Sequence, residues 1–515
     1  MTRLLPFQHK RFPGGRRLLV NECGDHHFVA EAVFELMLAG ALSEDHPEFP
    51  DLQSRLFVSA ELNDGFGVRK AAAKYRSRKA YLRDFTSLHM MVVTVRCNQR
   101  CEYCQVSCAE QDAYRYDMPV STAMKIVDLI LEAPSDSVKI EFQGGEPTLN
   151  WEAVAAAVRY AEERREKAGK KTVDFVLCTN LTAIREDQLR FCRDHGISVS
   201  TSLDGPKDLH DRYRVLRSKG SAYDLFRGNL ALAREIVGED RVDALMTATA
   251  ASLNAFPEII DEYEELGFGG VFIRSLNPYG FAAEKAAELG YGMASFVAAY
   301  AEAFRHVMKV NRRRFFPELF ATILLSRILT PFSTGFVDLQ SPAGTGISGA
   351  IYDYDGSVYP SDEARMLARM GDAHFRLGNV HVDSYREIFG GARLKDLIRG
   401  ACVETTPGCA YCAYQAYCGT DPVRNYLESG GEVRNMAGTP FCVKHKGIFD
   451  FLFSFLDGMT EEEEDVVWSW ITRSGRVQAA GGRPGGGIGG RGGAGPGRPG
   501  PEACPPPGDG VAGGV

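Results

Sequence analysis

Three cysteines lie close together in one segment, where Cys97, Cys101 and Cys104 follow the spacing C-x3-C-x2-C. Three thiolates on one loop can hold three irons of a cubane cluster and leave the fourth iron open to a non-protein ligand. Zinc is the competing interpretation. Structural zinc takes four ligands, usually in paired C-x2-C knuckles, and no fourth ligand lies close in this segment. The spacing therefore favours a [4Fe-4S] cluster.

A second cysteine group lies near the other end of the chain. Cys409, Cys412 and Cys418 follow C-x2-C-x5-C, and Cys442 comes after a gap. Four thiolates suit a structural zinc ion or a second iron–sulfur cluster equally well. The spacing alone leaves both interpretations open.

Small and polar residues follow several predicted strands at the point where each strand ends. They are Gly144, Gly145, Glu146 and Pro147 after 138–142, Thr179 and Asn180 after 173–177, Ser202 and Asp204 after 197–201, and Arg274 at the end of 270–274. The carboxyl ends of parallel strands meet at one edge, where active sites of βα barrels are built. We expect these residues to meet the cysteine loop, which follows strand 90–95.

The elements that position these residues alternate regularly. Six predicted strands between 90 and 274 are separated by amphipathic helices, which indicates an α/β fold with a parallel sheet, open or barrel-like. We expect this core to span 86–330. A hairpin followed by helices is expected in 1–85, a largely irregular region with the second cysteine group in 331–458, and a disordered Gly/Pro-rich tail in 474–515.

The composition is that of a globular protein. The 515 residues are 44% hydrophobic and 24% charged with a formal net charge of -8, so no basic excess points to nucleic acid. No stretch is long and apolar enough to span a bilayer, and the N-terminus lacks the apolar run of a secretory signal. We expect a cytoplasmic protein without a membrane partner, in which the clustered ones among the 13 cysteines serve metal or redox sites.

The cysteine loop and the strand-end residues together resemble the radical S-adenosylmethionine (SAM) superfamily. The resemblance implies a partial (β/α)6 barrel and a [4Fe-4S] cluster on Cys97, Cys101 and Cys104 whose open iron chelates SAM. It also implies SAM-binding roles for the residues at the strand ends, listed as follows: Gly144, Gly145, Glu146 and Pro147 at the amino group, Tyr103 at the adenine, and Thr179, Asn180, Ser202 and Asp204 around the rest of SAM. Arg214 and Arg274 either touch SAM or serve only in salt bridges.

The second cysteine group is similar to the SPASM extension of enzymes that modify peptides and proteins. This implies one auxiliary [4Fe-4S] cluster on Cys409, Cys412, Cys418 and Cys442. A second auxiliary cluster is expected to be absent, because Ala343, Ser361 and Pro422 stand where its cysteines belong. Cys402 is left over, as a packing residue or a substitute ligand.

Asp362 directly follows one of these lost ligands. In sulfatase maturases an aspartate at the matching place is the general base, which implies that Asp362 takes a proton during turnover. The alternative is that Asp362 and Glu363 only stabilise the N-terminus of a helix.

Three parts of the chain, 5–7 with 18–22, 341–344 with 359–367, and 418–423, are similar to the HxsB-type maturases of His-Xaa-Ser systems. That family implies a substrate protein with His-Xaa-Ser repeats, a second HxsC-like radical SAM partner, and an external electron donor such as flavodoxin or ferredoxin. The alternatives are a sulfatase-type maturase that makes formylglycine, a non-catalytic protein that recruits substrate, and a zinc-ribbon binding module. The N-terminal hairpin and helices are either a leader-peptide module of winged-helix type or a lid.

Overall fold

The computed structural model describes residues 3–59 and 65–480, with side chains as far as 472. Contacts divide the chain into 1–482 and 483–515, and the second unit lies outside the described residues. The tail was expected to begin at 474, but helix α19 (Glu461–Ala480) runs further. Residues 474–480 contain one glycine and no proline, so nothing there interrupts a helix. The rest of the predicted tail lies outside the described residues.

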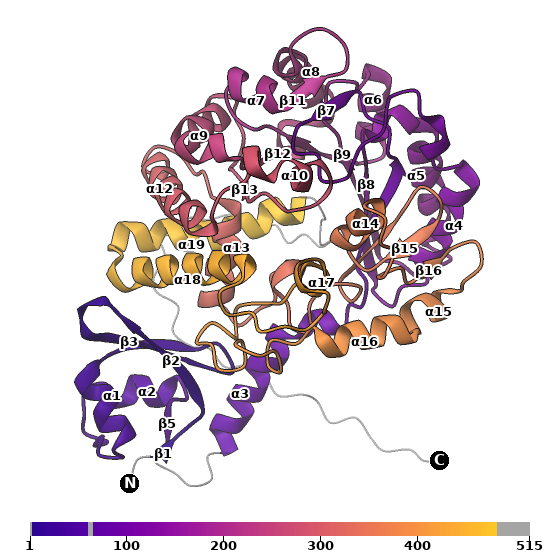
Figure 1. The fold of residues 1–515 in the computed structure, drawn as a ribbon. Coiled ribbons are helices and arrows are strands. Elements are labelled where there is room, and N and C mark those ends of the chain that lie inside the picture. The colour runs from indigo at the N-terminus through magenta and orange to yellow at the C-terminus, as the bar shows by residue number, and fades with distance from the viewer. Residues whose placement is uncertain (1–2, 60–64, 481–515) are drawn as a thin grey trace, which may run out of the picture. The chain divides into compact units, whose positions relative to one another are not determined.

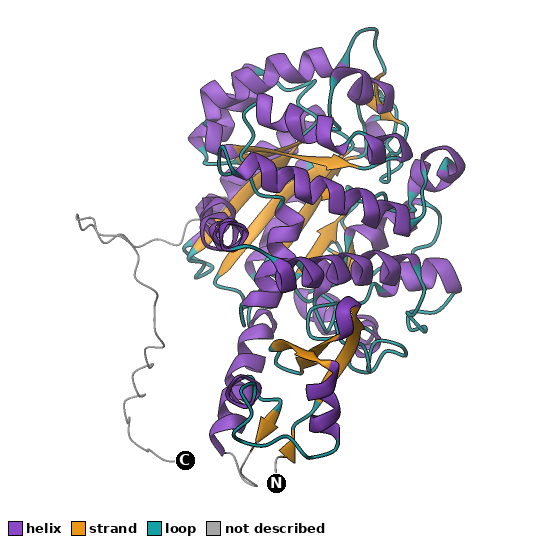
Figure 2. Cartoon of the chain, turned by 90° about the vertical axis from the view of Figure 1, so that its left-hand side faces the viewer, coloured by secondary structure: helices purple, strands orange, loops and turns teal. Residues whose placement is uncertain are grey.

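The centre of the fold is a mostly parallel sheet (Figures 1 and 2). Its strands adjoin in the order β13-β12-β10-β9-β8-β6-β14-β15-β16. The first six in this order are the predicted βα strands: β13 (Ile273–Arg274), β12 (Val242–Thr247), β10 (Ser198–Ser202), β9 (Thr172–Cys178), β8 (Ser137–Gly144) and β6 (Leu88–Thr94). All neighbours among these six pair in parallel. The predicted α/β class and parallel sheet are confirmed.

Helices pack around the sheet because each carries an apolar face. In α4 (Val120–Leu131), Ala123, Ile126, Val127 and Ile130 are fully buried at helical spacing. The other helices of this part are α5 (Trp151–Arg165), α6 (Glu186–Asp194), α7 (Lys207–Tyr213), α8 (Ala222–Val237), α9 (Phe256–Glu265), α10 (Gly280–Glu284), α11 (Ala286–Leu289), α12 (Met293–Asn311) and α13 (Leu319–Leu329). Strand β6 is apolar on both sides, with Met91, Val92 and Val93 at most 1% exposed, as a covered parallel strand requires.

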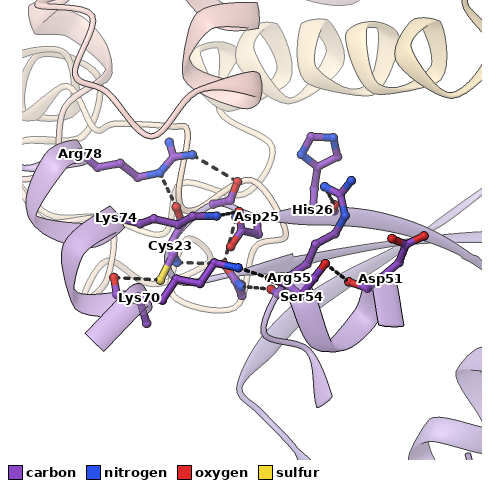
Figure 3. Close-up of polar contacts among 12 residues, drawn as sticks. Cys23, Asp25, His26, Asp51, Ser54, Arg55, Lys70, Lys74 and Arg78 are labelled. Atoms are coloured by element: carbon purple, nitrogen blue, oxygen red, sulfur yellow. Dashed lines mark hydrogen bonds and ion pairs between the residues drawn. The ribbon is translucent and has the colours of Figure 1, made fainter. Parts of the chain in front are cut away.

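The N-terminal residues form a small α+β unit with its own core. The predicted hairpin is present as β3 (Arg16–Asn21) and β4 (His26–Ala30), and β2 (Phe7–Phe12) adds a third antiparallel strand. The other elements are α1 (Glu31–Leu38), α2 (Phe49–Ser54), α3 (Gly65–Arg78) and the short pair β1 (Arg3–Leu4) and β5 (Val58–Ser59). Figure 3 shows Lys74 and Arg78 of α3 reaching the hairpin turn, where Arg78 donates to the carbonyls of Cys23 and Gly24.

Strand β3 belongs to two cores at once. Leu19 lies in the core of the N-terminal unit, whereas Leu18 and Val20 lie in the main core. Side chains alternate across a strand, so one strand serves both sides. The Tyr417 hydroxyl also donates to the Gly24 carbonyl at 2.9 Å, so the unit is attached to the region of the second cysteine group.

Residues 331–458 are more regular than expected. They contain β14 (Gly349–Tyr352), β15 (Ser357–Tyr359), β16 (Gly378–Asn379), α14 (Asp362–Arg369), α15 (Tyr385–Gly390), α16 (Ala392–Gly400), α17 (Pro422–Ser429) and α18 (Pro440–Gly458). Strand β14 pairs in parallel with β6 and thereby extends the central sheet. None of the helices within the described ranges has the length and apolar character needed to cross a bilayer.

Candidate active site

The predicted site residues meet at the carboxyl edge of the sheet. The cysteine loop follows β6, and it is fastened by antiparallel pairing of β7 (Gln99–Cys101) with β11 (Arg214–Leu216). The Cys97 thiol lies beside Asn180, whose Nδ2 is 3.8 Å from its sulfur. The first and third strand ends therefore lie together, as expected from parallel strands whose carboxyl ends share one edge.

The two glycines after β8 allow the backbone to run directly against the cysteine loop. The amide of Gly145 donates to the Thr94 carbonyl at 2.9 Å, and the amide of Glu146 donates to the Arg96 carbonyl at 2.7 Å. A Cβ atom on Gly144 would lie 2.1 Å from the Thr94 oxygen, and one on Gly145 would lie 2.3 Å from the Arg96 oxygen. Both positions therefore require glycine because of this close approach.

Glu146 is fully buried and connects two strand ends. Its carboxylate accepts hydrogen bonds from the Thr179 hydroxyl at 2.7 Å and the Asn180 amide at 2.8 Å, and also from the amide and hydroxyl of Thr148. Burial raises the pKa of Glu146 in spite of these donors. Pro147 follows at the start of a short 3-10 turn, Pro147–Asn150.

Asp204 and Arg214 form an ion pair in the interior. Arg214 Nε donates to Asp204 Oδ2 at 3.0 Å, and the side chains are 9% and 1% exposed. The Tyr103 hydroxyl donates to the same oxygen. Of the two sequence interpretations of Arg214, the structure displays the salt bridge, which ties the fourth strand end to the cysteine loop. Ser202 ends β10 nearby in the chain and is half-buried.

The second cysteine group surrounds the start of two helices. Cys409 and Cys412 lie in a loop, Cys418 precedes α17, and Cys442 lies in the first turn of α18. The α18 turn is capped by Thr439, whose hydroxyl accepts from the Cys442 amide at 3.2 Å. Burial, followed by the neighbouring thiols of Cys412 and Cys442, raises the pKa of Cys409 to about 12.

A cavity of about 440 Å³ adjoins the second group. Cys412 and Cys418 line it, together with Arg78, Lys79 and Arg327. Cys402 is half-buried and its thiol donates to the Ile398 carbonyl, which fits the packing interpretation.

A second cavity, of about 520 Å³, lies between the sheet and the C-terminal region. Strand residues such as Gln143, Ser200 and Arg274 line one side, and Asp362 and its neighbours line the other. Asp362 begins α14 after Ser361, which caps the helix by accepting from the Ala364 amide at 3.3 Å. Asp362 is therefore a helix N-terminal residue that lines a cavity, and its role as a base stays a prediction.

Burial, together with repulsion from Glu363, raises the pKa of Asp362 to about 6. A carboxylate with this pKa exchanges a proton readily near neutral pH, which a general base needs. One oxygen of Asp362 is buried and lacks a hydrogen-bond partner among the described residues.

Comparisons with known proteins agree with this geometry. Residues 91–263 match the family model of the radical SAM superfamily. The chain carries a radical SAM domain. This domain covers the cysteine loop, the two glycines with Glu146, and the Asp204–Arg214 pair.

Three relatives among the curated proteins share parts of the sequence. An uncharacterized protein of Methanocaldococcus jannaschii is 29% identical over 140 residues, 27% of this chain and 46% of the relative. A cysteine-type anaerobic sulfatase-maturating enzyme of Clostridium novyi is 27% identical over 156 residues, 28% of this chain and 40% of that enzyme. The enzyme of the same description from Clostridium perfringens is 24% identical over 377 residues, 69% of this chain and 93% of that enzyme. The chain thus spans less than half the length of the first two relatives.

Two solved structures share the fold. The structure of native anSMEcpe with bound AdoMet has a TM-score of 0.60 at 20% identity, covering 72% of this chain and 98% of that one. SuiB of Streptococcus suis bound to precursor peptide SuiA has a TM-score of 0.51 at 13% identity, covering 85% and 99%. The likeness in both extends beyond the radical SAM domain, because each covers more of the chain than residues 91–263.

The residues present fit an iron–sulfur cluster in the radical SAM domain by the chemistry of their donors. Cys97 and Cys104 both lie against the thiol of Cys108, so these two predicted ligands lie near each other. Burial raises the pKa of Cys101 to about 12, and a cationic iron site would favour the thiolate. No set of three Cys, His, Asp or Glu side chains within 3–59 and 65–480 is drawn together tightly enough to hold a metal ion. The assignments of both clusters to their cysteines therefore remain predictions.

The sequence analysis did not place several residues at the 520 Å³ cavity, including Glu363, which it considered only at the N-terminus of a helix. Asp338, Glu363, Asp421 and Lys444 all line the 520 Å³ cavity. They come from short, distant segments, and only Glu363 and Asp421 were adjacent to residues already singled out. Cys108 lies outside the C-x3-C-x2-C spacing, yet its thiol lies directly against two predicted ligands, Cys97 and Cys104.

Proposed function

We propose that this radical SAM enzyme modifies a side chain of a peptide or protein. The observation that carries the proposal is the cavity that joins the sheet to Asp362, because it offers space between strand residues, which include Arg274 of the predicted SAM site, and a carboxylate of raised pKa. The names of similar proteins support it, since they include sulfatase-maturating enzymes and SuiB with its precursor peptide. The finer proposal is a substrate with His-Xaa-Ser repeats and an HxsC-like radical SAM partner, on the sequence resemblance.

The chain's own residues divide the work. Cys97, Cys101 and Cys104 would hold a [4Fe-4S] cluster, and Cys409, Cys412, Cys418 and Cys442 an auxiliary one. When bound, the first cluster supplies the electron that cleaves SAM and so yields the radical that abstracts hydrogen from substrate.

The remaining site residues hold the cysteine loop and the strand ends in place around that step. Gly144 and Gly145 leave room for close backbone approach, and Glu146 keeps the third strand end in place. Asp362 accepts a proton as the substrate radical is oxidised, and an external donor such as flavodoxin or ferredoxin supplies electrons. The N-terminal unit grips a leader peptide. Its sheet order β2-β3-β4 leaves the outer edges of β2 and β4 without a partner among the named strands, and strand addition is a common mode of peptide capture.

The test is iron, sulfide and zinc content after anaerobic reconstitution, with Mössbauer spectra and an assay for 5′-deoxyadenosine. We expect two [4Fe-4S] clusters in the wild type, one in the Cys97/Cys101/Cys104→Ala variant, and 5′-deoxyadenosine only from the wild type. A wild type with one cluster and zinc on the remaining cysteines would make the second group structural. Absence of 5′-deoxyadenosine under reducing conditions would favour the non-catalytic recruiting protein.

Formation of formylglycine is the second candidate, favoured by the 24% identity that extends over 93% of the Clostridium perfringens enzyme. Against it, Ala343 and Ser361 stand where that architecture has further cluster ligands, and Ser361 lines the cavity. Incubation with a cysteine-bearing and a serine-bearing sulfatase peptide distinguishes the two. Formylglycine in either peptide, detected by mass spectrometry, would favour the sulfatase-type activity.

A further inference from the structure

The 520 Å³ cavity has a marked excess of acidic groups. Among the described residues, its lining includes six carboxylates: Glu141, Asp243, Asp338, Asp362, Glu363 and Asp421. Only three cationic side chains oppose them: Arg274, Arg424 and Lys444. The cavity is therefore an electronegative space inside the protein, where charges interact more strongly than in water.

Four of these carboxylates gather on the C-terminal side of the cavity. Glu363 is the common neighbour, because it repels Asp338, Asp362 and Asp421 and contributes to the raised pKa of each, after burial. Asp338 is an exposed residue that lines the cavity. Such a group of like charges is costly unless a counter-charge joins it.

The cations of the cavity attract some of these groups, since Arg274 and Lys444 lower the pKa of Asp338, but none of them forms a salt bridge with the four within the described residues. Arg424 is engaged with Glu428 at 2.7 Å, and Lys444 donates to the Ser275 hydroxyl at 3.3 Å. Across 3–59 and 65–480, no Lys, Arg or His nitrogen lies within 4 Å of a carboxylate oxygen of the four. Only Asp421 accepts a hydrogen bond there, from the Arg424 amide at 2.9 Å.

As an independent observation, two buried oxygen atoms at this cavity have no hydrogen-bond partner among the described residues. Thr420 is only 2% exposed and lines the cavity, and its hydroxyl has no partner in the described part of the chain. One oxygen of Asp362 is in the same condition. Buried oxygens of this kind are rarely left unpaired in proteins, so a ligand that carries N–H groups is expected here.

The arrangement fits an organic cation better than a metal ion. No three acidic side chains of the described ranges are close enough together to hold a metal. A guanidinium or ammonium group spreads several donors and matches separated carboxylates. The volume of the cavity, about 520 Å³, is ample for one long side chain.

We propose that this cavity binds a basic side chain of the substrate peptide, held by Glu363, Asp338 and Asp421 with the Thr420 hydroxyl. The inference rests on the proposed function, in which the substrate is a peptide. It adds that the residue entering the cavity, or its immediate neighbour, carries a positive charge. With a neutral serine or cysteine alone, the six carboxylates of the cavity would face only the three cationic side chains that line it.

The experiment measures peptide binding without turnover. The probes are two capped pentapeptides, Gly-Gly-Xaa-Gly-Gly, in which Xaa is arginine or its neutral isostere citrulline. They are titrated calorimetrically at neutral pH into reconstituted holoenzyme with SAM and without reductant. We expect the arginine peptide to bind about tenfold more tightly or better, as charge-assisted hydrogen bonds provide.

The variants Glu363→Gln and Asp338→Asn should abolish this preference. Neither side chain makes a hydrogen bond within the described residues, so both variants are expected to fold, as circular dichroism verifies. The exposed carboxylate of Asp396 pairs with Arg399 on α16 and with no other described residue. It provides the control Asp396→Asn, whose preference should equal that of the wild type.

Equal binding of the two peptides, including no binding of either, overturns the inference. A preference that survives both Glu363→Gln and Asp338→Asn also overturns it, because the cation then binds elsewhere. Failure of the proposed function is separately visible: it removes 5′-deoxyadenosine formation under reductant, whereas failure of this inference leaves that reaction intact.

Discussion

The ion pair between Asp204 and Arg214 permits a quantitative test of how the site is held together. In Asp204→Asn the side chain keeps its shape but loses its charge, and Arg214 remains interior with no carboxylate at its Nε. Breaking a buried pair by removing one partner costs about 3–5 kcal/mol, because the remaining charge is uncompensated. At about 1.4 kcal/mol for each factor of ten, the unfolding equilibrium constant should rise by roughly two to three and a half orders of magnitude.

The measurement is urea unfolding followed by circular dichroism, together with iron bound per chain. Iron content should fall as well, because Arg214 begins β11, which pairs with the cysteine loop at Cys101. The double variant Asp204→Asn/Arg214→Met removes both charges and should recover most of the loss. Asp187→Asn is the matched control. Its pair with Arg185 spans 2.9 Å but is more than half exposed, so a change below about 0.5 kcal/mol is expected. A loss under about 1 kcal/mol in Asp204→Asn, or no recovery in the double variant, would refute the reasoning.

Three further predictions concern the cofactor and substrate sites. Gly145→Ala should load little iron, since its Cβ would lie 2.3 Å from the Arg96 oxygen. The control Gly228→Ala has open space on α8 and should load iron normally. Equal iron content in the two variants would contradict this prediction. Asp362→Asn should stop peptide modification but not SAM cleavage, and wild-type modification should rise with pH through about 6 as the carboxyl ionises; a rate independent of pH there counts against a base. The pKa of Asp362 is higher in the folded chain than in the unfolded chain, so its protonated form favours folding at a pH below the pKa of the unfolded chain. That contribution is lost as the pH rises to about 6. Asp362→Asn should therefore stabilise the chain above that pH. Cys418→Ala should remove one cluster's worth of iron while 5′-deoxyadenosine still forms, and zinc release instead would identify a structural metal.

The central fold was readable from the sequence because its signals are local and strong. Strands such as β6 are runs of apolar residues with turn residues at their ends, and the helices between them repeat their apolar residues at helical spacing. Once the strands are parallel, their carboxyl ends must share an edge. That rule alone brings Asn180 beside Cys97 and Glu146 against the cysteine loop.

The group of carboxylates that lines the 520 Å³ cavity could not be predicted from the sequence in the same way. Asp338, Glu363 and Asp421 come from three short segments, and nothing in their local sequence distinguishes them from exposed carboxylates. Their proximity depends on how the irregular C-terminal region folds back on the sheet. Arg214 is a second example. The sequence predicted either a ligand of SAM or a salt bridge, and the structure is needed to see that Arg214 pairs with the buried Asp204.

Strand β14 has a consequence for how this chain can be divided. It lies beside β6 in the same sheet, although more than 250 positions separate Gly349 from its partner Leu88. A protein cut at the predicted boundary of 330 would leave the first strand of the radical SAM core with a bare row of amide and carbonyl groups, the usual template for aggregation. The C-terminal region therefore cannot be treated as a detachable accessory, and exchanging it between related enzymes would require carrying this strand, or an equivalent one, along with the barrel it completes.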